Sequence, residues 1–337
     1  MIDANDSHYL PMATPVFSVL ILNWHAEKFL PVCFAALEKQ TFQDFEVILL
    51  NNGSDEAIST ISEQQFPQSR LSILNSATNL GFAAGNNLAA RQAKGEYIVL
   101  LNADAFPEPD WLEKIHQACI DHPHHFFASR LVKANDPQTL DGEWNVYHAS
   151  GLAWRKNHAQ ALSKATNEPK EVLSACAAAG VYPREAFEAV GGFDEDFFAY
   201  MEDIDLDFRM QLLGYPCLYL PQAVVRHVGS GSTGARSGFQ LYHGHRNLVW
   251  TFVKNMPGIL FWLLLPCHIL INLLYLVLAL FIPSGKEILH GKRDALKGLG
   301  KALAKRKQIQ ASRKESIWQI ARLLDWNPLS PLIKSRF

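Results

Sequence analysis

The sequence predicts an α/β fold built on a mostly parallel sheet. Apolar runs of strand length alternate with stretches of helical length over the first hundred residues, which is the pattern of βαβ units. The strand-like runs are apolar on both faces, as expected for strands covered by helices on two sides. Polar residues follow several of these runs directly, at the carboxyl ends where open α/β sheets bind ligands.

The first half of the chain contains the clearest elements, which follow a polar leader at residues 1–14. Period and composition distinguish the β-rich runs from the helical stretches. The cluster Asn51-Asn52-Gly53-Ser54-Asp55 is a turn that we expect to open a helix. In chain order we expect strands at 16–22, 45–50, 71–74 and 97–101, and helices at 27–39, after the turn at 51–55, and at 83–94.

The strand at 97–101 leads straight into Asn102-Ala103-Asp104 and a loop punctuated by prolines. The Asp104 carboxylate is a hard oxygen donor suited to Mg²⁺ or Mn²⁺, and such a cation would hold a diphosphate. Alternatively, Asn102 and Asp104 form an Asx-turn that only caps the strand end. These residues alone leave both interpretations open.

The second half is less regular. Gly191-Gly192 is a helix-ending signal, and Gly214 ends a helix whose buried side we expect to hold Ile204, Phe208 and Leu212. Residues 133–170 are polar and give no regular pattern beyond loop or hairpin. We expect helices at 110–121, 185–190 and 202–213, strands at 126–132, 217–220 and 223–227, a small apolar segment at 174–182 and a Gly/Ser-rich loop at 229–238.

The apolar run at 259–282 has 24 residues and is interrupted by Pro266. Its length would allow one membrane crossing, but a single crossing would separate the basic tail from the rest of the chain. We therefore expect an interfacial or re-entrant hairpin kinked at Pro266, with residues 292–314 on anionic headgroups. The alternative is a buried helix pair followed by a solvated basic helix.

Charge and cysteine usage restrict the compartment and the partners. Residues 283–337 hold 13 Lys/Arg against 4 Asp/Glu, and residues 1–282 hold 18 against 29. The basic tail implies an anionic surface. Because it has few aromatic residues and no nucleic-acid-reading motif, we expect lipid and no nucleic acid. Five cysteines without a CxxC pair indicate a reducing cytosol, and no secretory signal is found in the first fifteen residues.

Four motifs occur together and in a specific order. They are Asn51-Asn52-Gly53-Ser54, then Asn79-Leu80-Gly81-Phe82 with Gly85-Asn86-Asn87, then Leu101-Asn102-Ala103-Asp104, and finally Gly191-Gly192-Phe193-Asp194 continuing to Tyr200-Met201-Glu202-Asp203. As a set, from about residue 16 to 255, they resemble the family 2 glycosyltransferases, most closely the rhamnosyltransferase-like bacterial branch.

The resemblance implies a GT-A fold over residues 15–256, in which a Rossmann-like nucleotide-binding half is fused to an acceptor-binding half. Residues 257–337 would form a membrane-associated region. The resemblance also implies inverting transfer from a nucleotide-activated sugar with Mg²⁺ or Mn²⁺. Asp104 matches the family's metal-binding aspartate, and His227 matches a position that often joins the metal or the diphosphate.

An inverting displacement needs one carboxylate that takes the proton from the attacking hydroxyl. The resemblance assigns this role to Asp203, at a helix start that helps to keep it ionised. Glu202 and Tyr200 are expected on the acceptor side. For Asp205 and Asp207 we expect only helix-start acids that complement the dipole, with Arg209 as a local ion-pair partner.

The expected nucleotide-sugar contacts follow the same resemblance. Gly81 would let the backbone approach the nucleotide, and Arg246 would pair with the diphosphate or with the acceptor half. Asn51 stands where relatives use an aspartate, so the choice of nucleotide stays open. The full expected set is Asn23, Asn51, Asn79, Gly81, Phe82, Asn86, Asn102, Asp104 and Arg246.

The resemblance leads us to expect transfer of L-rhamnose from dTDP-rhamnose, and the apolar run and the basic tail lead us to expect a lipid-linked or lipopolysaccharide-type acceptor. It would take place at the cytoplasmic face of the inner membrane, with the protein peripheral or re-entrant. Rival donors are UDP-galactofuranose, UDP-N-acetylglucosamine and other dTDP-deoxysugars. A non-catalytic membrane scaffold that retains the fold is the alternative from another class.

Overall fold

The computed structural model describes residues 14–54, 66–229 and 237–334. The helix expected after the turn at 51–55, nearly all of the polar leader and most of the loop at 229–238 lie outside these ranges. The expected strands and helices of the first half are otherwise confirmed, with bounds that move by a few residues. They are β1 (Phe17–Asn23), α1 (Leu30–Glu38), preceded by the 3₁₀ turn η1 (Glu27–Phe29), β2 (Phe45–Asn52), β3 (Leu71–Ser76), preceded by η2 (Gln68–Arg70), α3 (Gly81–Ala90) and β4 (Tyr97–Asn102).

These four strands form a parallel sheet in the order β3-β2-β1-β4. The second half of the sheet is mixed, because β11 pairs antiparallel with both β4 and β6. The mostly parallel sheet expected for the nucleotide-binding half is therefore confirmed, and the sheet continues as a mixed one in the second half. The further elements are β5 (Ala105–Pro107), α4 (Trp111–Asp121), β6 (Phe126–Lys133), β11 (Ala179–Pro183), α5 (Arg184–Ala189), η4 (Glu195–Phe197), α6 (Glu202–Leu213) and β12 (Cys217–His227).

The two short strands expected at 217–220 and 223–227 are one strand, β12. Its pairing with β6 shifts register between Leu220 and Val224. Pro221 lies in this interval and has no N–H to donate, so the ladder is interrupted while the strand continues. The irregular segment at 133–170 also contains strands: β7 (Asp136–Gly142), β8 (Asn145–Tyr147), β9 (Ala153–Arg155) and β10 (Lys170–Val172), with the 3₁₀ turn η3 (Leu162–Lys164).

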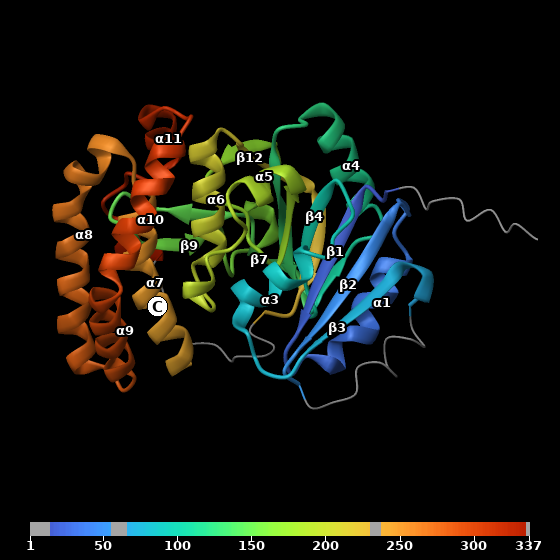
Figure 1. Ribbon diagram of the computed structural model, residues 1–337, viewed down its shortest axis with the longest axis horizontal. Coiled ribbons are helices and arrows are strands. Elements are labelled where there is room, and N and C mark those ends of the chain that lie inside the picture. Colours follow the sequence, from blue (N-terminus) through green and yellow to red (C-terminus); the bar gives the residue numbers. More distant parts are fainter. Residues whose placement is uncertain (1–13, 55–65, 230–236, 335–337) are drawn as a thin grey trace, which may run out of the picture.

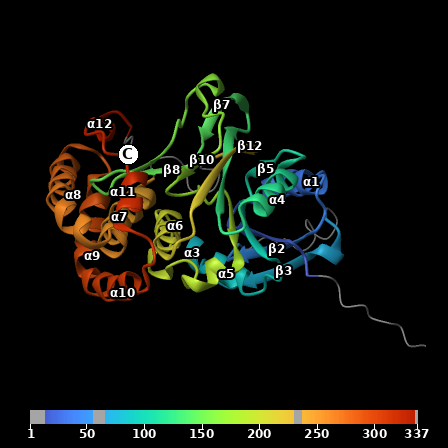
Figure 2. The ribbon, with the colours of Figure 1, turned by 90° about the horizontal axis from the view of Figure 1, so that it is seen from above.

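Helices cover both faces of the sheet, which explains why its strands are apolar on both sides (Figures 1 and 2). On one face, Val19 and Ile21 of β1 pack in a core with Phe34 of α1 and Trp111 of α4. On the other face, Leu20 belongs to a second core with residues of α3, α5 and α6. The sheet is thus a middle layer whose carboxyl-end loops remain accessible.

The C-terminal residues form a separate layer of helices packed on α6 (Figure 1). Within it, α7 contacts both α9 and α10. The elements are α7 (Gly238–Asn255), α8 (Gly258–Leu278), η5 (Ala279–Phe281), α9 (Gly285–Lys297), α10 (Leu299–Ser312), α11 (Ile317–Leu323) and α12 (Ser330–Lys334).

The expected re-entrant hairpin is wrong, because the apolar run is one continuous helix, α8, that passes through Pro266. A proline removes a single backbone N–H, and here the helix continues for three further turns beyond it. The expected headgroup contact of residues 292–314 is also wrong for Lys292, which is 5% exposed. Its ammonium group donates to the His245 carbonyl oxygen at 3.0 Å and to Asn272 Oδ1.

Helix α6 has the predicted bounds and ends at Gly214, which adopts φ 94°. Its acids, however, do not merely complement the helix dipole, because Asp205 and Asp207 are completely buried. Asp205 accepts from Arg209, the expected partner, at 3.0 Å and also pairs with Lys254 Nζ at 2.7 Å. Asp207 accepts from the Ala175 N–H at 2.7 Å. These carboxylates hold α6 to α7 and to the segment before β11.

Lys254 of α7 is 2% exposed and contacts the carboxylates of both Asp194 and Asp205. We expect Lys254→Met to lower the free energy of unfolding by about 3 kcal/mol, because the substitution leaves buried carboxylates short of a cation. Arg209 and Lys305 still pair with them, which limits the loss. Urea denaturation followed by tryptophan fluorescence measures the change. Lys286→Met, at an exposed lysine, is the control and should have little effect.

Candidate active site

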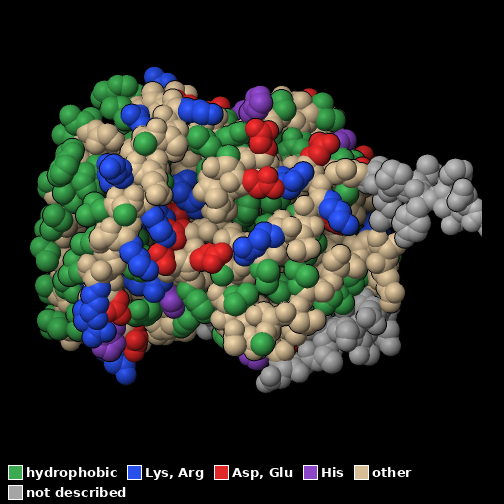
Figure 3. All heavy atoms as spheres, viewed as in Figure 1, with side chains coloured by type: hydrophobic (Ala, Val, Ile, Leu, Met, Phe, Trp, Pro, Cys, Tyr) green, Lys and Arg blue, Asp and Glu red, His purple; other side chains and the backbone are tan. Residues whose placement is uncertain are grey.

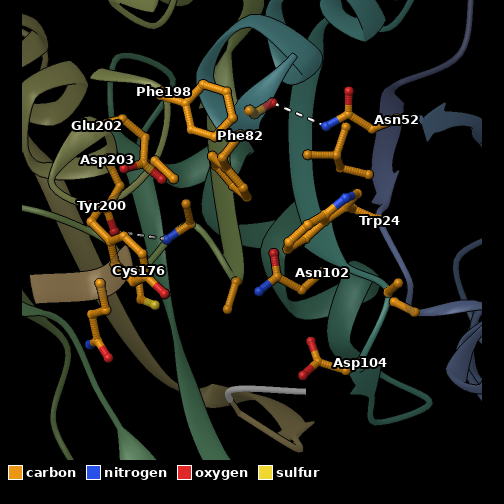
Figure 4. Close-up of a pocket in the computed structure, with 18 of the residues that line it drawn as sticks. Trp24, Asn52, Phe82, Asn102, Asp104, Cys176, Phe198, Tyr200, Glu202 and Asp203 are labelled. Carbon is orange, nitrogen blue, oxygen red and sulfur yellow. Dashed lines mark hydrogen bonds between the residues drawn. The ribbon is translucent and has the colours of Figure 1, made fainter. Parts of the chain in front are cut away.

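A cavity of about 340 Å³ opens at the carboxyl ends of the parallel strands (Figure 4). One wall comes from the ends of β1, β2 and β4, with Trp24, Asn52 and Asn102. The other wall comes from the segment before β11 and from the start of α6, with Asp203. The cavity therefore lies between the N-terminal sheet and the second half of the chain.

Asp104 and His227 face each other at one end of this cavity, although they are far apart in the sequence. Strands β5 and β12 pair antiparallel with His227 opposite Ala105, which brings the two side chains together. His227 Nε2 lies 3.3 Å from Asp104 Oδ1, and His227 Nδ1 lies 2.7 Å from Asp141 Oδ2. Burial lowers the pKa of His227, but hydrogen bonds to Asp104 and Asp141 outweigh it and raise the pKa above its usual value.

This donor pair fits a divalent cation. A carboxylate and an imidazole nitrogen both suit Mn²⁺, and the carboxylate suits Mg²⁺. The bond from His227 Nδ1 to Asp141 is the outer contact that metal-binding histidines usually make. Within residues 14–54, 66–229 and 237–334, no group of three or more His, Cys, Asp or Glu side chains is arranged so that it could hold a metal ion. A cation here would complete its shell with phosphate oxygens and water, as Mg²⁺ does in nucleotide sites.

Asp203 lies elsewhere on the lining of the same cavity, at the start of α6 (Figure 4). Its Oδ1 accepts from the Ile204 N–H at 2.8 Å, and its Oδ2 accepts from Asn145 Nδ2 at 3.0 Å. The two aspartates that the sequence singled out therefore border one space.

Glu202 also lines the cavity, but its environment is different. Burial, followed by the charge of Asp203, raises the pKa of Glu202 well above its usual range. Burial also raises the pKa of Asp203, while the bonds from Ile204 and Asn145 oppose that rise. Glu202 Oε2 has no hydrogen-bond partner among the described residues. Of the two adjacent carboxyl groups, Asp203 is therefore the better stabilised as an anion.

The loop before α6 is strained. Phe198, Tyr200 and Met201 adopt positive φ angles of 65°, 67° and 69°, which are costly for residues other than glycine. Asn247 of α7 is fully buried and its Nδ2 donates to the carbonyl oxygens of Phe197, Ala199 and Tyr200 at 3.0, 2.9 and 2.7 Å. A single amide from the helical layer thus holds the loop that carries Tyr200 into the cavity.

Arg246 does not reach the cavity. Its Nη2 donates to the carbonyl oxygens of Asp196 and Phe197 at 2.9 and 2.8 Å, and its guanidinium lies over the Trp250 ring at 4.5 Å. The expected contact of Arg246 with a diphosphate therefore stays a prediction. Arg246 secures the same loop as its neighbour Asn247.

The expected nucleotide contacts divide into two groups. Asn23, Asn51 and Asn86 do not line the cavity, and their amides bond to nearby residues of the protein. Asn23 Nδ2 donates to Glu27 at 2.8 Å, Asn51 Nδ2 to the Ser54 carbonyl at 3.1 Å, and Asn86 Nδ2 to the Phe82 carbonyl at 2.9 Å. The expected site residues that line the cavity are Asn79, Gly81, Phe82, Asn102, Asp104, Tyr200, Glu202, Asp203 and His227.

Gly81 uses its conformational freedom for a contact within the protein. It adopts φ +79°, and a Cβ there would lie 2.6 Å from the Phe198 carbonyl oxygen and ring. The Ala83 N–H donates to that carbonyl oxygen at 3.1 Å. The glycine therefore lets the start of α3 meet the strained loop before α6.

Sequence reasoning missed several residues of the lining. Trp24 follows the carboxyl end of β1, and this position was the available signal. Asn52 links the strand ends, since its Nδ2 donates to Asn79 Oδ1 at 3.0 Å and its Oδ1 accepts from the Leu80 N–H at 2.9 Å. No local pattern pointed to several others, among them Arg155, Cys176, Phe239 and Gln240.

Comparison with known proteins agrees with this geometry. The family model described as Glycosyl transferase family 2 matches residues 18–191, just over half of the chain. The chain is 27% identical over 249 residues, 66% of this chain and 78% of the relative, to the N-acetylglucosaminyl-diphospho-decaprenol L-rhamnosyltransferase of Mycobacterium tuberculosis strain H37Rv.

Two solved structures are similar in fold. Staphylococcus aureus TarS residues 1–349 with UDP-GlcNAc has a TM-score of 0.55 and 15% identity, and the match covers 92% of this chain and 93% of that one. GalNAc-T7 with UDP, GalNAc and Mn²⁺ has a TM-score of 0.57 and 15% identity over 72% of this chain, which spans 48% of that protein. The expected GT-A fold is thereby confirmed. The chain belongs to glycosyl transferase family 2.

Proposed function

We propose that the protein transfers a sugar with inversion from a nucleotide-activated donor, with a divalent cation and with Asp203 as the base. The observation that carries this proposal is that Asp104 and Asp203 border one cavity at the carboxyl ends of the sheet (Figure 4). In this proposal, one carboxylate would serve the diphosphate side of the reaction, and the other would serve the incoming acceptor.

In the proposed reaction, the acceptor oxygen forms a bond to the anomeric carbon while the bond from that carbon to the diphosphate oxygen breaks. Asp203, whose carboxylate accepts hydrogen bonds from Asn145 and the Ile204 N–H, takes the proton of the acceptor hydroxyl. Asp104 and His227 would hold the cation, which neutralises the charge of the departing diphosphate when bound. Since imidazole is a softer ligand than Mg²⁺ prefers, we expect Mn²⁺ to support the reaction better.

For the donor we propose dTDP-rhamnose, and for the acceptor a lipid-linked or lipopolysaccharide-type saccharide. The support is the mycobacterial relative, whose name gives L-rhamnose as the sugar and a diphospho-decaprenol lipid as the acceptor. Tyr200 and Glu202, which line the cavity beside Asp203, would contact the acceptor. UDP-galactofuranose, UDP-N-acetylglucosamine and other dTDP-deoxysugars are the donors to be compared.

The test uses the purified full chain with Mn²⁺ or Mg²⁺, a panel of these nucleotide sugars and a polyprenyl-diphosphate-linked saccharide. Release of nucleoside diphosphate and formation of the lipid-linked product are measured together. We expect dTDP-rhamnose to give the highest kcat/KM. Transfer from a different donor contradicts the sugar assignment only, whereas no release or transfer from any donor contradicts the enzyme proposal.

We further propose that α8 lies in the plane of the cytoplasmic membrane surface. The segment formed by α8 and η5 is long and apolar enough to cross a membrane. Of its most apolar 18 residues, 17% are buried inside the protein. Four residues, Leu260, Phe261, Leu264 and His268, are nevertheless buried against the protein. His268 Nδ1 bonds the Ser150 carbonyl oxygen at 2.8 Å. A helix fixed along one side in this way presents its other side to lipid.

The surface supports this arrangement. Figure 3 shows hydrophobic side chains along the edge where Figure 1 places α8, with Lys and Arg side chains on the helices beside it. Contiguous exposed apolar surface is typical of sites that contact a membrane or another protein. Exposed apolar residues of the band are Ile259, Trp262, Leu263, Ile269, Leu270, Leu273, Leu274, Val277 and Leu278.

Replacing both Leu270 and Leu273 by Asp is expected to reduce binding to anionic vesicles at least about tenfold, because each leucine contributes about 1.5 kcal/mol or more on burial in lipid. The two side chains are 67% and 53% exposed, so folding should tolerate the change. Vesicle sedimentation measures the bound fraction. Ile120→Asp, on α4 and 60% exposed, is the matched control. Unchanged sedimentation of the double variant would show that this face does not contact lipid.

A further inference from the structure

Asp141, at the end of β7, lies behind the candidate metal site and is 4% exposed. One of its oxygens, Oδ2, contacts both His227 Nδ1, at 2.7 Å, and Arg155 Nη1. The backbone carbonyl of Asp141 is 2.8 Å from His158 Nδ1 and also accepts from Arg155 Nη1 at 3.3 Å. Asp141 thus connects two side chains of the cavity lining, Arg155 and His227, without lining the cavity itself.

These contacts form a continuous chain of side chains. It runs from Asp104 through His227 to Asp141 and ends at Arg155. Because the Nδ1–H of neutral His227 donates a hydrogen bond to Asp141, the lone pair of Nε2 points toward Asp104. Metal-binding histidines need this tautomer, and a carboxylate on the far nitrogen fixes both the tautomer and the ring orientation.

Two glycines make room for this arrangement. A Cβ at Gly142 would lie 2.1 Å from Arg155 Cδ, and Gly142 adopts φ +149°, so no other residue would fit beneath the Arg155 side chain. A Cβ at Gly229 would lie 3.3 Å from Asp141 Oδ1. The backbone on both sides of the ion pair is therefore shaped to let Arg155 reach Asp141 and to let Asp141 reach His227.

We propose that Asp141 is a positioning residue that holds His227 ready to bind the divalent cation, with Arg155 holding Asp141 in turn. The inference rests on the proposed metal-dependent function. It extends that function to a residue that touches neither the cation nor the sugar. A purely structural ion pair between Asp141 and Arg155 would stabilise the β7–β9 region without affecting metal affinity.

The test is Mn²⁺ binding by the full chain in the presence of dTDP or UDP, followed by the EPR signal of free Mn²⁺. Asp141→Asn keeps the size of the side chain but removes the charge. We expect it to weaken Mn²⁺ binding about 10- to 100-fold, the usual cost of losing such an outer contact. Transfer activity should recover when Mn²⁺ is raised by the same factor. Asp136→Asn, an exposed aspartate on the same strand, is the matched control.

A double-mutant cycle separates positioning from general destabilisation. In a His227→Gln background, Asp141→Asn should change Mn²⁺ affinity less than about twofold, because its target is absent. If Asp141→Asn does not yield folded protein, Asp141→Glu keeps the charge but displaces the carboxylate, and it should weaken Mn²⁺ binding in the same way.

The outcomes are distinguishable. If wild type binds Mn²⁺ and Asp141→Asn binds it within twofold, the positioning role is overturned while the proposed function stands. An equal loss from Asp141→Asn in both backgrounds also overturns it, since the effect then does not pass through His227. If wild type binds no Mn²⁺ with either nucleotide, the metal-dependent function itself fails.

Discussion

Replacing Asp203 by Asn is expected to lower kcat for sugar transfer about 10³-fold while leaving nucleotide and Mn²⁺ affinity nearly unchanged. An amide cannot accept the proton of the acceptor hydroxyl, and positioned bases contribute rate factors of about this size. Asn can still occupy the space beside Asn145 and the Ile204 N–H, so the fold should tolerate it. Single-turnover rates with saturating donor, together with nucleotide titration, separate the two effects.

The pH dependence of kcat provides an independent check. Burial raises the pKa of Asp203 above that of an ordinary aspartate. The base works only when ionised, so kcat should fall as the pH drops through this raised value. The acidic limb of the profile should therefore lie at higher pH than for an exposed aspartate, and it should disappear in Asp203→Asn.

Glu202→Gln is the matched control for this experiment. Because burial and the charge of Asp203 favour the neutral form of the Glu202 carboxyl, an amide of the same shape should reduce kcat less than about tenfold. If Glu202→Gln causes the larger loss and Asp203→Asn the smaller, the roles of the two neighbouring carboxyl groups are exchanged.

The sequence predicted the parts of the site that depend on local order. Asp104 follows an apolar strand, and Asp203 opens a helix that Gly214 ends, so both could be placed from neighbouring residues. Their meeting in one cavity depends on how β11 and α6 pack beyond β4, which no local pattern specifies. That the two aspartates meet was expected only because the order of the motifs resembles that of the family 2 glycosyltransferases.

Residues 133–178 show why the rest was not predicted. Asp141, Arg155 and Cys176 come from short strands and loops with weak periodicity, and each meets its partners across long sequence separations. His227 was assigned from the resemblance, but its outer partner Asp141 was not. Polar residues in irregular segments gain their roles only from tertiary contacts, which single-sequence patterns do not contain.

Arg246 was expected to pair with the diphosphate or with the acceptor half, and Asp205 to complement the helix dipole with Arg209 as its partner. In the structure, both side chains bond to other residues of the protein. Arg246 holds the carbonyl groups of the loop at 196–197, and Asp205 is buried between Arg209 and Lys254. The helical layer therefore reaches into the site, because α7 supplies Asn247, Arg246 and Lys254 to the segment that leads to Asp203.

Asp104→Ala should have an effect as large as that of Asp203→Asn but of a different kind. Losing a metal ligand removes several kcal/mol of stabilisation from the departing diphosphate, so kcat/KM should fall about 10³-fold. Nucleoside diphosphate affinity measured with Mn²⁺ should fall as well, whereas Asp203→Asn leaves it intact. Calorimetric titration of dTDP and UDP with and without Mn²⁺ measures this difference.

Raising the Mn²⁺ concentration then distinguishes the proposed metal ligand Asp104 from the positioning residue Asp141. Asp141→Asn leaves the ligands Asp104 and His227 in place, so excess Mn²⁺ should restore its activity. Asp104→Ala removes a ligand and should stay inactive at any Mn²⁺ concentration. Asp110→Ala, a partly exposed aspartate that pairs with Lys114 at the start of α4, is the control and should behave as wild type. Full recovery of Asp104→Ala in excess Mn²⁺ would mean that the cation is held by other groups, and the assignment of the site to the end of β4 would be wrong.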